Sequence, residues 1–171
     1  PVGQPGELQF RYEGNMLGYW QQPELTAATL KDGWLRTGDV GRLDAEGNLY
    51  ILDRIKDMIV TNGYNVFPKE VELVLHEHAG VQQAAVVGLP HEVRGEDVHA
   101  FVVRRPESQV AADEILDWCN RNLARFKVPR GIDFVSEMPL TASGKIRRFV
   151  LRDQARAEPR SGFPARHSRH P

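Results

Sequence analysis

The pattern of apolar and polar positions divides the chain into a β-rich first third and a longer part in which strands alternate with helices. In the first third, strand-like runs are expected over Gly6–Tyr12 and on both sides of a glycine-bearing turn at 44–48, with a short helix over Pro23–Leu30. This segment is too short to build a good independent core. We therefore expect residues 1–55 to be the C-terminal end of a larger, incomplete domain.

Beyond this segment the periodicity changes. A strand is expected over Lys56–Thr61, closed by the Asn62-Gly63 turn. After Pro68, apolar side chains recur at helical spacing, at Val71, Val74, Leu75 and Ala79. Further strands are expected over 83–88, 98–104 and 132–135, with helices over 112–126 and 147–157. The pattern predicts an α+β protein in which residues 56–157 form a small α/β sandwich.

Composition narrows the classes of function. The hydrophobic content of 41% and the charged content of 26% are those of a soluble globular protein, and a net charge of -1 gives no overall field for attracting nucleic acid. Without an apolar run long enough to span a bilayer and with a single cysteine, Cys119, the chain is expected to be cytoplasmic. It begins at Pro1 without a methionine, which favours a fragment, and the Pro-, Arg- and His-rich residues 158–171 are expected to be disordered.

The loop Pro139–Arg148, with sequence PLTASGKIRR, presents the candidate catalytic residue. Lys145 follows a Ser-Gly pair, where the backbone is permissive and a long cationic side chain can reach a phosphate or carboxylate. A Walker-type phosphate loop needs a glycine at position 139 and a hydroxyl residue at position 146, and these positions are Pro and Ile. A phosphate loop is therefore excluded here, and other motifs must decide what the lysine does.

Three further segments accompany this loop. Thr37-Gly38-Asp39 places a carboxylate at the end of a glycine turn, where it suits a sugar's vicinal hydroxyls or, alternatively, bonds its own backbone. The run Leu52–Ile59 alternates four charges with apolar residues, which alone indicates an amphipathic strand with a solvated face. The third segment, Asn62–Glu72, is a turn that leads into a helix.

In this order and spacing, the motifs Thr-Gly-Asp, Asp-Arg-x-Lys-Asp, Asn-Gly-Tyr-Asn-Val-x-Pro-x-Glu-Val-Glu and Ser-Gly-Lys closely resemble one known family. It is the C-terminal part of AMP-forming acyl-CoA synthetases. Their adenylate-forming superfamily also includes peptide-synthetase adenylation domains and firefly luciferase. The resemblance extends over residues 1–157.

The resemblance implies a two-step reaction in which a carboxylate attacks the α-phosphate of ATP and the thiol of CoA then displaces AMP. Matching positions imply that Asp39 holds the ribose hydroxyls, that Arg54 approaches the ribose and phosphate, and that Lys145 bridges the attacking carboxylate and the α-phosphate. Lys56 matches the hinge about which residues 56–157 swing as a mobile lid. The swing carries the Gly63 loop to the pantetheine tunnel.

The family's phosphate loop, its magnesium-supporting motif and its acyl pocket are not found in this sequence, so Mg²⁺ would be held outside it. The missing N-terminal domain is an expected partner, and a fatty or other medium-to-large carboxylic acid is the expected substrate. The fragment alone is expected to be inactive. Two alternatives stay open: an adenylating domain that loads a carrier protein's pantetheine, and a stand-alone nucleotide- or partner-binding module.

Other conspicuous residues are expected to be structural. His76 and His78 are two apart, which on a helix directs them to different faces, so no metal site is expected. Cys119 shares the apolar stripe of its helix and is expected in the core. Glu70 and Glu72 are expected to favour the helix dipole. The arginines of the last helix are expected on a solvated face, at 147, 148, 152 and 156.

Overall fold

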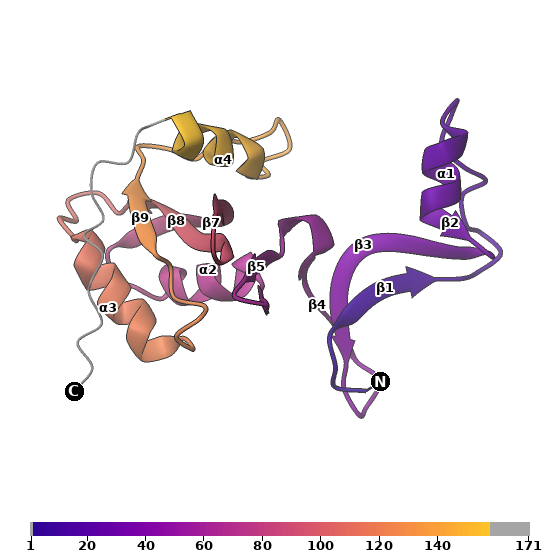
Figure 1. Ribbon diagram of the computed structural model, residues 1–171, viewed down its shortest axis with the longest axis horizontal. Helices are drawn as coiled ribbons and strands as arrows, with labels where there is room; N and C mark the ends of the chain where they lie inside the picture. The colour runs from indigo at the N-terminus through magenta and orange to yellow at the C-terminus, as the bar shows by residue number, and fades with distance from the viewer. Residues whose placement is uncertain (1, 158–171) are drawn as a thin grey trace.

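The computed structural model describes residues 2–157 and shows two lobes, each with its own β-sheet (Figure 1). The first lobe comprises residues 2–54 and the second lobe residues 58–157. The 3₁₀ helix η1, Ile55–Asp57, joins them. That the lobes are separate domains divided at residue 55, with residues 56–157 mobile, stays a prediction; the tail 158–171 lies outside the described residues.

The first lobe is a four-stranded antiparallel sheet organised by one long strand. Strand β3 pairs with each of the other three strands. At Gly41 of β3 an added Cβ would lie 2.7 Å from the Leu8 side chain, so a larger residue there would have to displace that side chain. The elements are β1 Gly6–Phe10, α1 Pro23–Thr29, β2 Leu30–Lys31, β3 Trp34–Leu43 and β4 Leu49–Arg54.

The second lobe contains a five-stranded sheet, in which four strands follow the order β6-β5-β8-β7. The fifth strand, β9, pairs in parallel with β8. Helices and mostly antiparallel strands confirm the predicted α+β class. The elements are β5 Ile59–Thr61, β6 Tyr64–Val66, α2 Pro68–His76, β7 Val81–His91, β8 Gly95–Arg104, α3 Ala112–Asn122, β9 Gly131–Phe134 and α4 Arg148–Ala157.

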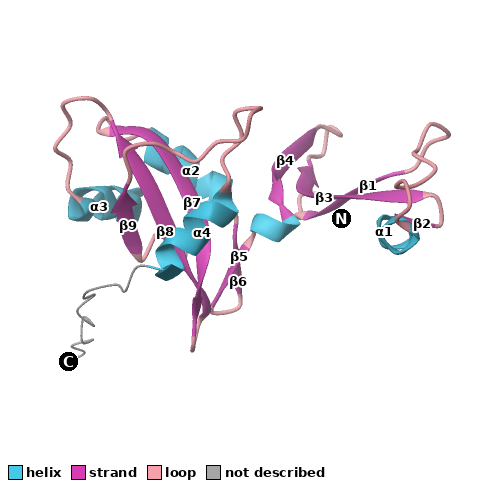
Figure 2. Ribbon diagram, turned by 90° about the horizontal axis from the view of Figure 1, so that it is seen from above, coloured by secondary structure: helices cyan, strands magenta, loops and turns pink. Residues whose placement is uncertain are grey.

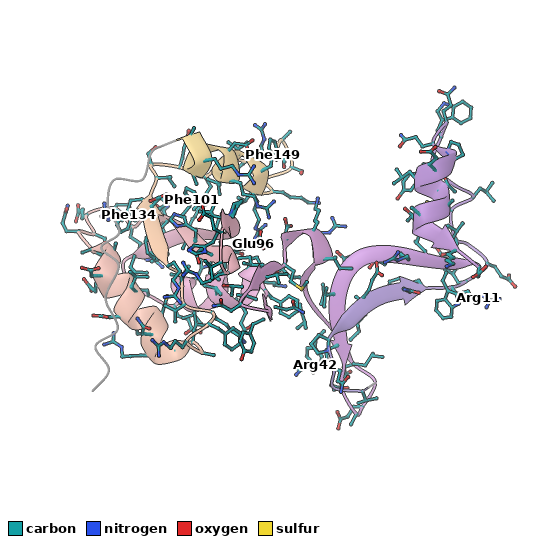
Figure 3. All side chains as sticks on the ribbon, viewed as in Figure 1. Arg11, Arg42, Glu96, Phe101, Phe134 and Phe149 are labelled. Carbon is teal, nitrogen blue, oxygen red and sulfur yellow. The ribbon has the colours of Figure 1, made fainter. Side chains whose placement is uncertain are left out.

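Two hydrophobic clusters lie on opposite faces of the second sheet. Neighbouring residues of β7 alternate between them: Val86 packs with Leu75 and Ile115 from α2 and α3, whereas Val87 packs with Leu151 from α4. Figure 2 shows α4 on one side of the sheet and α2 on the other. Figure 3 shows Phe101 beneath α4, inside the second cluster. The strands are therefore covered by helices on both faces.

Burial is uneven between the lobes. In residues 2–54 only Val40 and Gly41 are buried, whereas the second lobe contains both hydrophobic clusters. Large apolar side chains of the first lobe are instead exposed, among them Trp20 at 86% and Ile51 at 57%. The first lobe thus folds as a sheet without a core of its own, as expected from its length.

Three local expectations are wrong. The strand expected over 56–61 is η1 followed by the short strand β5. The helix expected over 112–126 ends at Asn122, because Leu123 has an extended backbone. Ala79 lies beyond the end of α2 and is exposed. In the two helices, apolar spacing continues past the residue at which the backbone leaves the helix.

Candidate functional site

Asp39 and Arg54 form the first part of the candidate site. They are cross-strand partners on β3 and β4, and Nε of Arg54 lies 3.0 Å from Oδ1 of Asp39. The expectation that Asp39 ends a turn is wrong, because β3 continues through it to Leu43. Gly38 adopts a φ of +70° inside the strand, and the register of β3 with β4 shifts after Val40. The local irregularity takes the place of the expected turn.

Thr37 organises the backbone around this pair. Its hydroxyl donates to the carbonyl of Leu8 at 2.9 Å and accepts the Asp39 N–H at 3.0 Å, while its own carbonyl accepts Nη2 of Arg54 at 3.3 Å. The side chains of Asp39 and Arg54 stay 32% and 52% exposed. An ion pair with this much solvent contact adds little stability, so both groups remain accessible to a polar ligand.

Lys145 lies on a closed loop between β9 and α4. The Thr141 N–H donates to the Lys145 carbonyl at 2.8 Å, and the Lys145 N–H donates to Oγ1 of Thr141 at 3.0 Å. Gly144 has a φ of +78°, which suits glycine, and Leu140 bridges to Ile146. The loop is therefore a small hairpin with the exposed lysine near its tip.

Lys56 and Gly63 lie on either side of β5. Lys56 is an exposed residue of η1. Asn62 and Gly63 have φ values of +49° and +79° and close the β5–β6 hairpin, in which Thr61 pairs with Tyr64. An added Cβ at Gly63 would meet nothing within 4 Å, so open space borders this turn.

The structure brings Asp39 and Arg54 together but leaves Lys145 apart from them. Among residues 2–157 no hydrogen bond or ion pair joins the Lys145 side chain to either residue. Lys145 belongs to the second lobe and the Asp39–Arg54 pair to the first. Any site that uses all three residues must therefore form between the lobes.

Sequence reasoning missed a cluster of charges where the lobes meet. Nη2 of Arg148 contacts both carboxylate oxygens of Glu72, at 2.7 and 2.9 Å, and Nη2 of Arg152 lies 3.4 Å from Oδ1 of Asp57. Oδ2 of Asp53 accepts the Lys69 N–H at 2.8 Å. We call the five charged side chains the junction cluster: Asp53, Asp57, Glu72, Arg148 and Arg152.

The junction cluster corrects two expectations. Arg148 and Arg152 are 22% and 25% exposed and join α4 to other elements, instead of lying on a solvated face. Glu72 also accepts the Val86 N–H at 2.8 Å, so it does more than favour the helix dipole. Burial lowers the pKa of the Arg148 guanidinium, but the charge of Glu72 and its hydrogen bonds outweigh this and raise the pKa. The i, i+4 spacing of Arg148 and Arg152 puts them on one face of α4, and this was the sequence feature that could have indicated a shared role.

Cys119 lies in the core, as expected. Cys119 is fully buried, and burial raises the pKa of its thiol to about 11, which disfavours the reactive thiolate. No group of three potential metal ligands occurs among the residues that the structure describes. Within the same residues, no helix has the length and apolar character needed to cross a membrane.

Comparison with known proteins shows what the second lobe is similar to. The family model of the AMP-binding enzyme C-terminal domain matches residues 70–145. This match covers less than half of the chain. The chain is also 46% identical over 158 residues to a long-chain-fatty-acid–CoA ligase of Escherichia coli O6:H1 (strain CFT073). The alignment covers 92% of this chain but only 28% of that relative. The chain thus spans little more than a quarter of the relative's length.

Solved structures match most of the chain, both lobes included. ATP-bound MatB from Rhodopseudomonas palustris is 36% identical, with a TM-score of 0.87 over 92% of this chain and 31% of that chain. The amide bond synthetase McbA from Marinactinospora thermotolerans is 41% identical, with a TM-score of 0.83 over 90% and 32%. The resemblance to the C-terminal part of adenylate-forming enzymes is therefore confirmed.

Proposed function

We propose that this chain is the C-terminal part of an AMP-forming acyl-CoA synthetase that acts on a fatty or other medium-to-large carboxylic acid. The observation that carries the proposal is the solvent-accessible Asp39–Arg54 pair on one lobe together with the Lys145 hairpin on the other. The 46% identity to a long-chain-fatty-acid–CoA ligase supports the substrate class. In the complete protein, the N-terminal part would supply the phosphate loop, the acyl pocket and the Mg²⁺ site.

In the first half-reaction, a carboxylate oxygen attacks the α-phosphorus of ATP, and the bond to pyrophosphate breaks. Asp39 would accept hydrogen bonds from the ribose hydroxyls through its oxygen that is not engaged with Arg54, since Oδ1 contacts Nε. Arg54 would place a permanent positive charge beside the ribose and phosphate. Lys145 would offset the negative charge that accumulates as the carboxylate approaches the phosphate.

In the second half-reaction, the sulfur of CoA attacks the acyl carbonyl carbon, and the bond to the AMP oxygen breaks. The second lobe would turn about Lys56 between the two steps, because Lys145 serves only the first. The open space beside Gly63 would then border the pantetheine chain. ATP and CoA are thus the proposed co-substrates.

A second candidate function differs only in the acceptor. McbA, named an amide bond synthetase, matches this chain at a TM-score of 0.83, against 0.87 for MatB, so an acceptor that gives an amide is the second candidate. A carrier-protein pantetheine is a third acceptor, which reacts through a thiol as CoA does. The run Asp53–Asp57 differs from the Gly-Arg-x-Asp-x-Gln pattern of carrier-loading domains, which favours free CoA.

The experiment that tests the proposal uses the complete protein and a panel of carboxylic acids of graded chain length. Pyrophosphate exchange reports the first half-reaction. The second is read by supplying the acyl-adenylate with CoA, a phosphopantetheinylated carrier protein or a simple amine. We expect exchange with fatty acids and transfer to CoA. If none of the carboxylic acids supports pyrophosphate exchange, the proposal is refuted. If the acyl group is transferred only to an acceptor other than CoA, the second candidate is established.

A further inference from the structure

The hinge proposed at Lys56 is flanked by two carboxylates with different partners. Asp57 ends η1, directly after the proposed hinge, and pairs with Arg152 of α4 in the second lobe. Asp53 precedes the hinge, on β4, yet Oδ2 of Asp53 accepts the backbone N–H of Lys69 in α2 at 2.8 Å. Only the second of these contacts links the two lobes.

The Asp53 carboxylate is held in place for this contact. Its other oxygen, Oδ1, accepts the N–H of Arg54 at 2.8 Å, so both oxygens have donors in a fixed arrangement. The side chain is only partly exposed. The arrangement leaves Asp53 pointing from the first lobe toward the start of α2.

Helix α2 lacks a cap of its own. Its N-cap residue is Phe67, which has no oxygen to offer the first turn, and Pro68 occupies the first helical position. The Lys69 N–H is one of the donors that a helix leaves unpaired at this end, and Asp53 satisfies it from outside the second lobe. If the second lobe turned away, α2 would lose the only side-chain cap it has among the described residues.

Charge in the junction cluster favours the same arrangement. Asp53, Asp57 and Glu72 all raise the pKa of the buried Arg148 guanidinium, and Asp53 is the one member of the three that precedes the hinge. Rotation about the hinge would leave Asp57 and Glu72 with the arginines but remove Asp53. The cluster therefore distinguishes one orientation of the lobes from others.

We propose that Asp53 is a positioning residue that holds the two lobes in the orientation seen here by capping α2 across the hinge. The same orientation occurs in a nucleotide complex of a similar protein, since ATP-bound MatB matches 92% of the chain, both lobes included, at a TM-score of 0.87. Asp53 acts on the lobes and touches no substrate. Its kinetic consequence rests on the proposed function, whereas its structural consequence does not.

The structural test measures the distance between the lobes in the 171-residue chain. Nitroxide labels are attached to cysteines placed at the exposed positions Glu46 and Arg121, in a Cys119→Ala background, and pulsed paramagnetic resonance gives the distance distribution. We expect Asp53→Ala to broaden or shift the distribution. Asp53→Asn should shift the distribution less, because its single amide oxygen can still accept the Lys69 N–H while the Arg54 N–H loses its acceptor. Asp57→Ala is the matched control and should leave the centre of the distance distribution unchanged.

Two outcomes would overturn the proposal. One is a distribution for Asp53→Ala that superimposes on that of the unsubstituted chain. The other is a shift in Asp57→Ala as large as that in Asp53→Ala, which would assign the effect to the cluster in general. Circular dichroism on the same samples verifies folding. If the alanine variant fails to fold, the smaller shift expected for Asp53→Asn is compared with Asp57→Ala in its place, and an unshifted Asp53→Asn distribution would then overturn the proposal.

The kinetic test uses the complete protein and compares the two half-reactions. A residue that only supports the fold lowers both rates together. A residue that selects one orientation changes their ratio, and we expect Asp53→Ala to change it by about threefold or more, the effect of losing roughly one hydrogen bond. If Asp53→Ala shifts the distance between the labels but leaves the ratio of the two half-reaction rates unchanged, only the kinetic role is refuted. Absence of either half-reaction in the unsubstituted protein would count against the proposed function, with the label distances still testing Asp53.

Discussion

Nη2 of Arg148 sits between the two carboxylate oxygens of Glu72, and this contact joins the first turn of α4 to α2 across the edge of the second sheet. The side chains are only 22% and 12% exposed. Because Glu72 also accepts the Val86 N–H, one carboxylate connects two helices and a strand. The loop that carries Lys145 ends where α4 begins, so this ion pair helps to fix the base of that loop.

Removal of Arg148 should therefore destabilise the second lobe. We expect Arg148→Ala to lower the free energy of unfolding by about 2–4 kcal/mol, because Glu72 is left as a buried, partly unpaired charge. Arg156→Ala is the matched control; its side chain is 58% exposed and its effect should be below about 0.5 kcal/mol. Urea denaturation of both variants measures the difference, and equal values would show that the ion pair is not a structural contact.

Lys145→Ala in the complete protein should lower the first half-reaction by about two to three orders of magnitude, as loss of a charge that stabilises a transition state does. Transfer from a supplied acyl-adenylate to CoA should largely persist, because the charge is needed in one step only. The neighbouring exposed cation gives a control, Arg147→Ala, which should retain both activities. Equal losses in the two half-reactions would remove Lys145 from its proposed role.

Asp39→Ala should weaken the use of ATP. We expect the KM for ATP to rise by roughly 10- to 100-fold, the range for hydrogen bonds to a charged group, while Asp39→Asn should lose less because it keeps one acceptor oxygen. Steady-state kinetics over a range of ATP concentrations provide the measurement. An unchanged KM in the alanine variant would make Asp39 a structural partner of Arg54 and nothing more.

Gly63→Leu should act on the second half-reaction. A residue with a side chain is strained at a φ of +79°, but the space beside Gly63 is open, so the chain should still fold. We expect normal pyrophosphate exchange and reduced thioester formation. Gly63→Ala carries the same backbone strain with a smaller side chain, and it should reduce thioester formation less. Identical behaviour of the two variants would mean that strain, and not obstruction, is responsible.

Lys56→Pro should restrict the turn between the lobes, since proline fixes φ near -65°. Adenylate formation is expected to survive while transfer to CoA falls. Lys56→Ala leaves the backbone free and should keep both rates. If the proline variant also keeps both rates, the flexible point lies elsewhere in the junction.

The sequence predicted the elements of the second lobe well because each carries a strong local signal. Pro68 begins α2, Asn62-Gly63 closes a hairpin, and nearly continuous apolar runs mark β7 and β8. It placed Asp39 in a turn because glycine usually ends a strand, but pairing with β1 and β4 on both sides holds β3 continuous. Tertiary pairing thus overrode a local signal.

The junction cluster shows what local patterns cannot supply. Arg148 and Glu72 are 76 positions apart, and nothing near either residue in the sequence indicates the other. An arginine on a helix with acidic neighbours is usually solvated, and only the packing of α4 on the sheet through Leu151 turns Arg148 inward. Asp53 is similar, because its partner is a backbone N–H that no side-chain pattern reveals.

The hairpin around Lys145 changes what a ligand must contribute when it arrives. Its backbone hydrogen bonds close between Pro139 and Arg147, so the main chain is already ordered without a substrate. Only the side-chain rotamers of Lys145 remain to be fixed, at a cost in conformational entropy of about 1.5–2 kcal/mol. Ordering a flexible loop of the same length would cost several times more. Preorganisation of this kind would let the same lysine enter and leave a site repeatedly, with little of the binding energy spent on rebuilding the loop at each turnover.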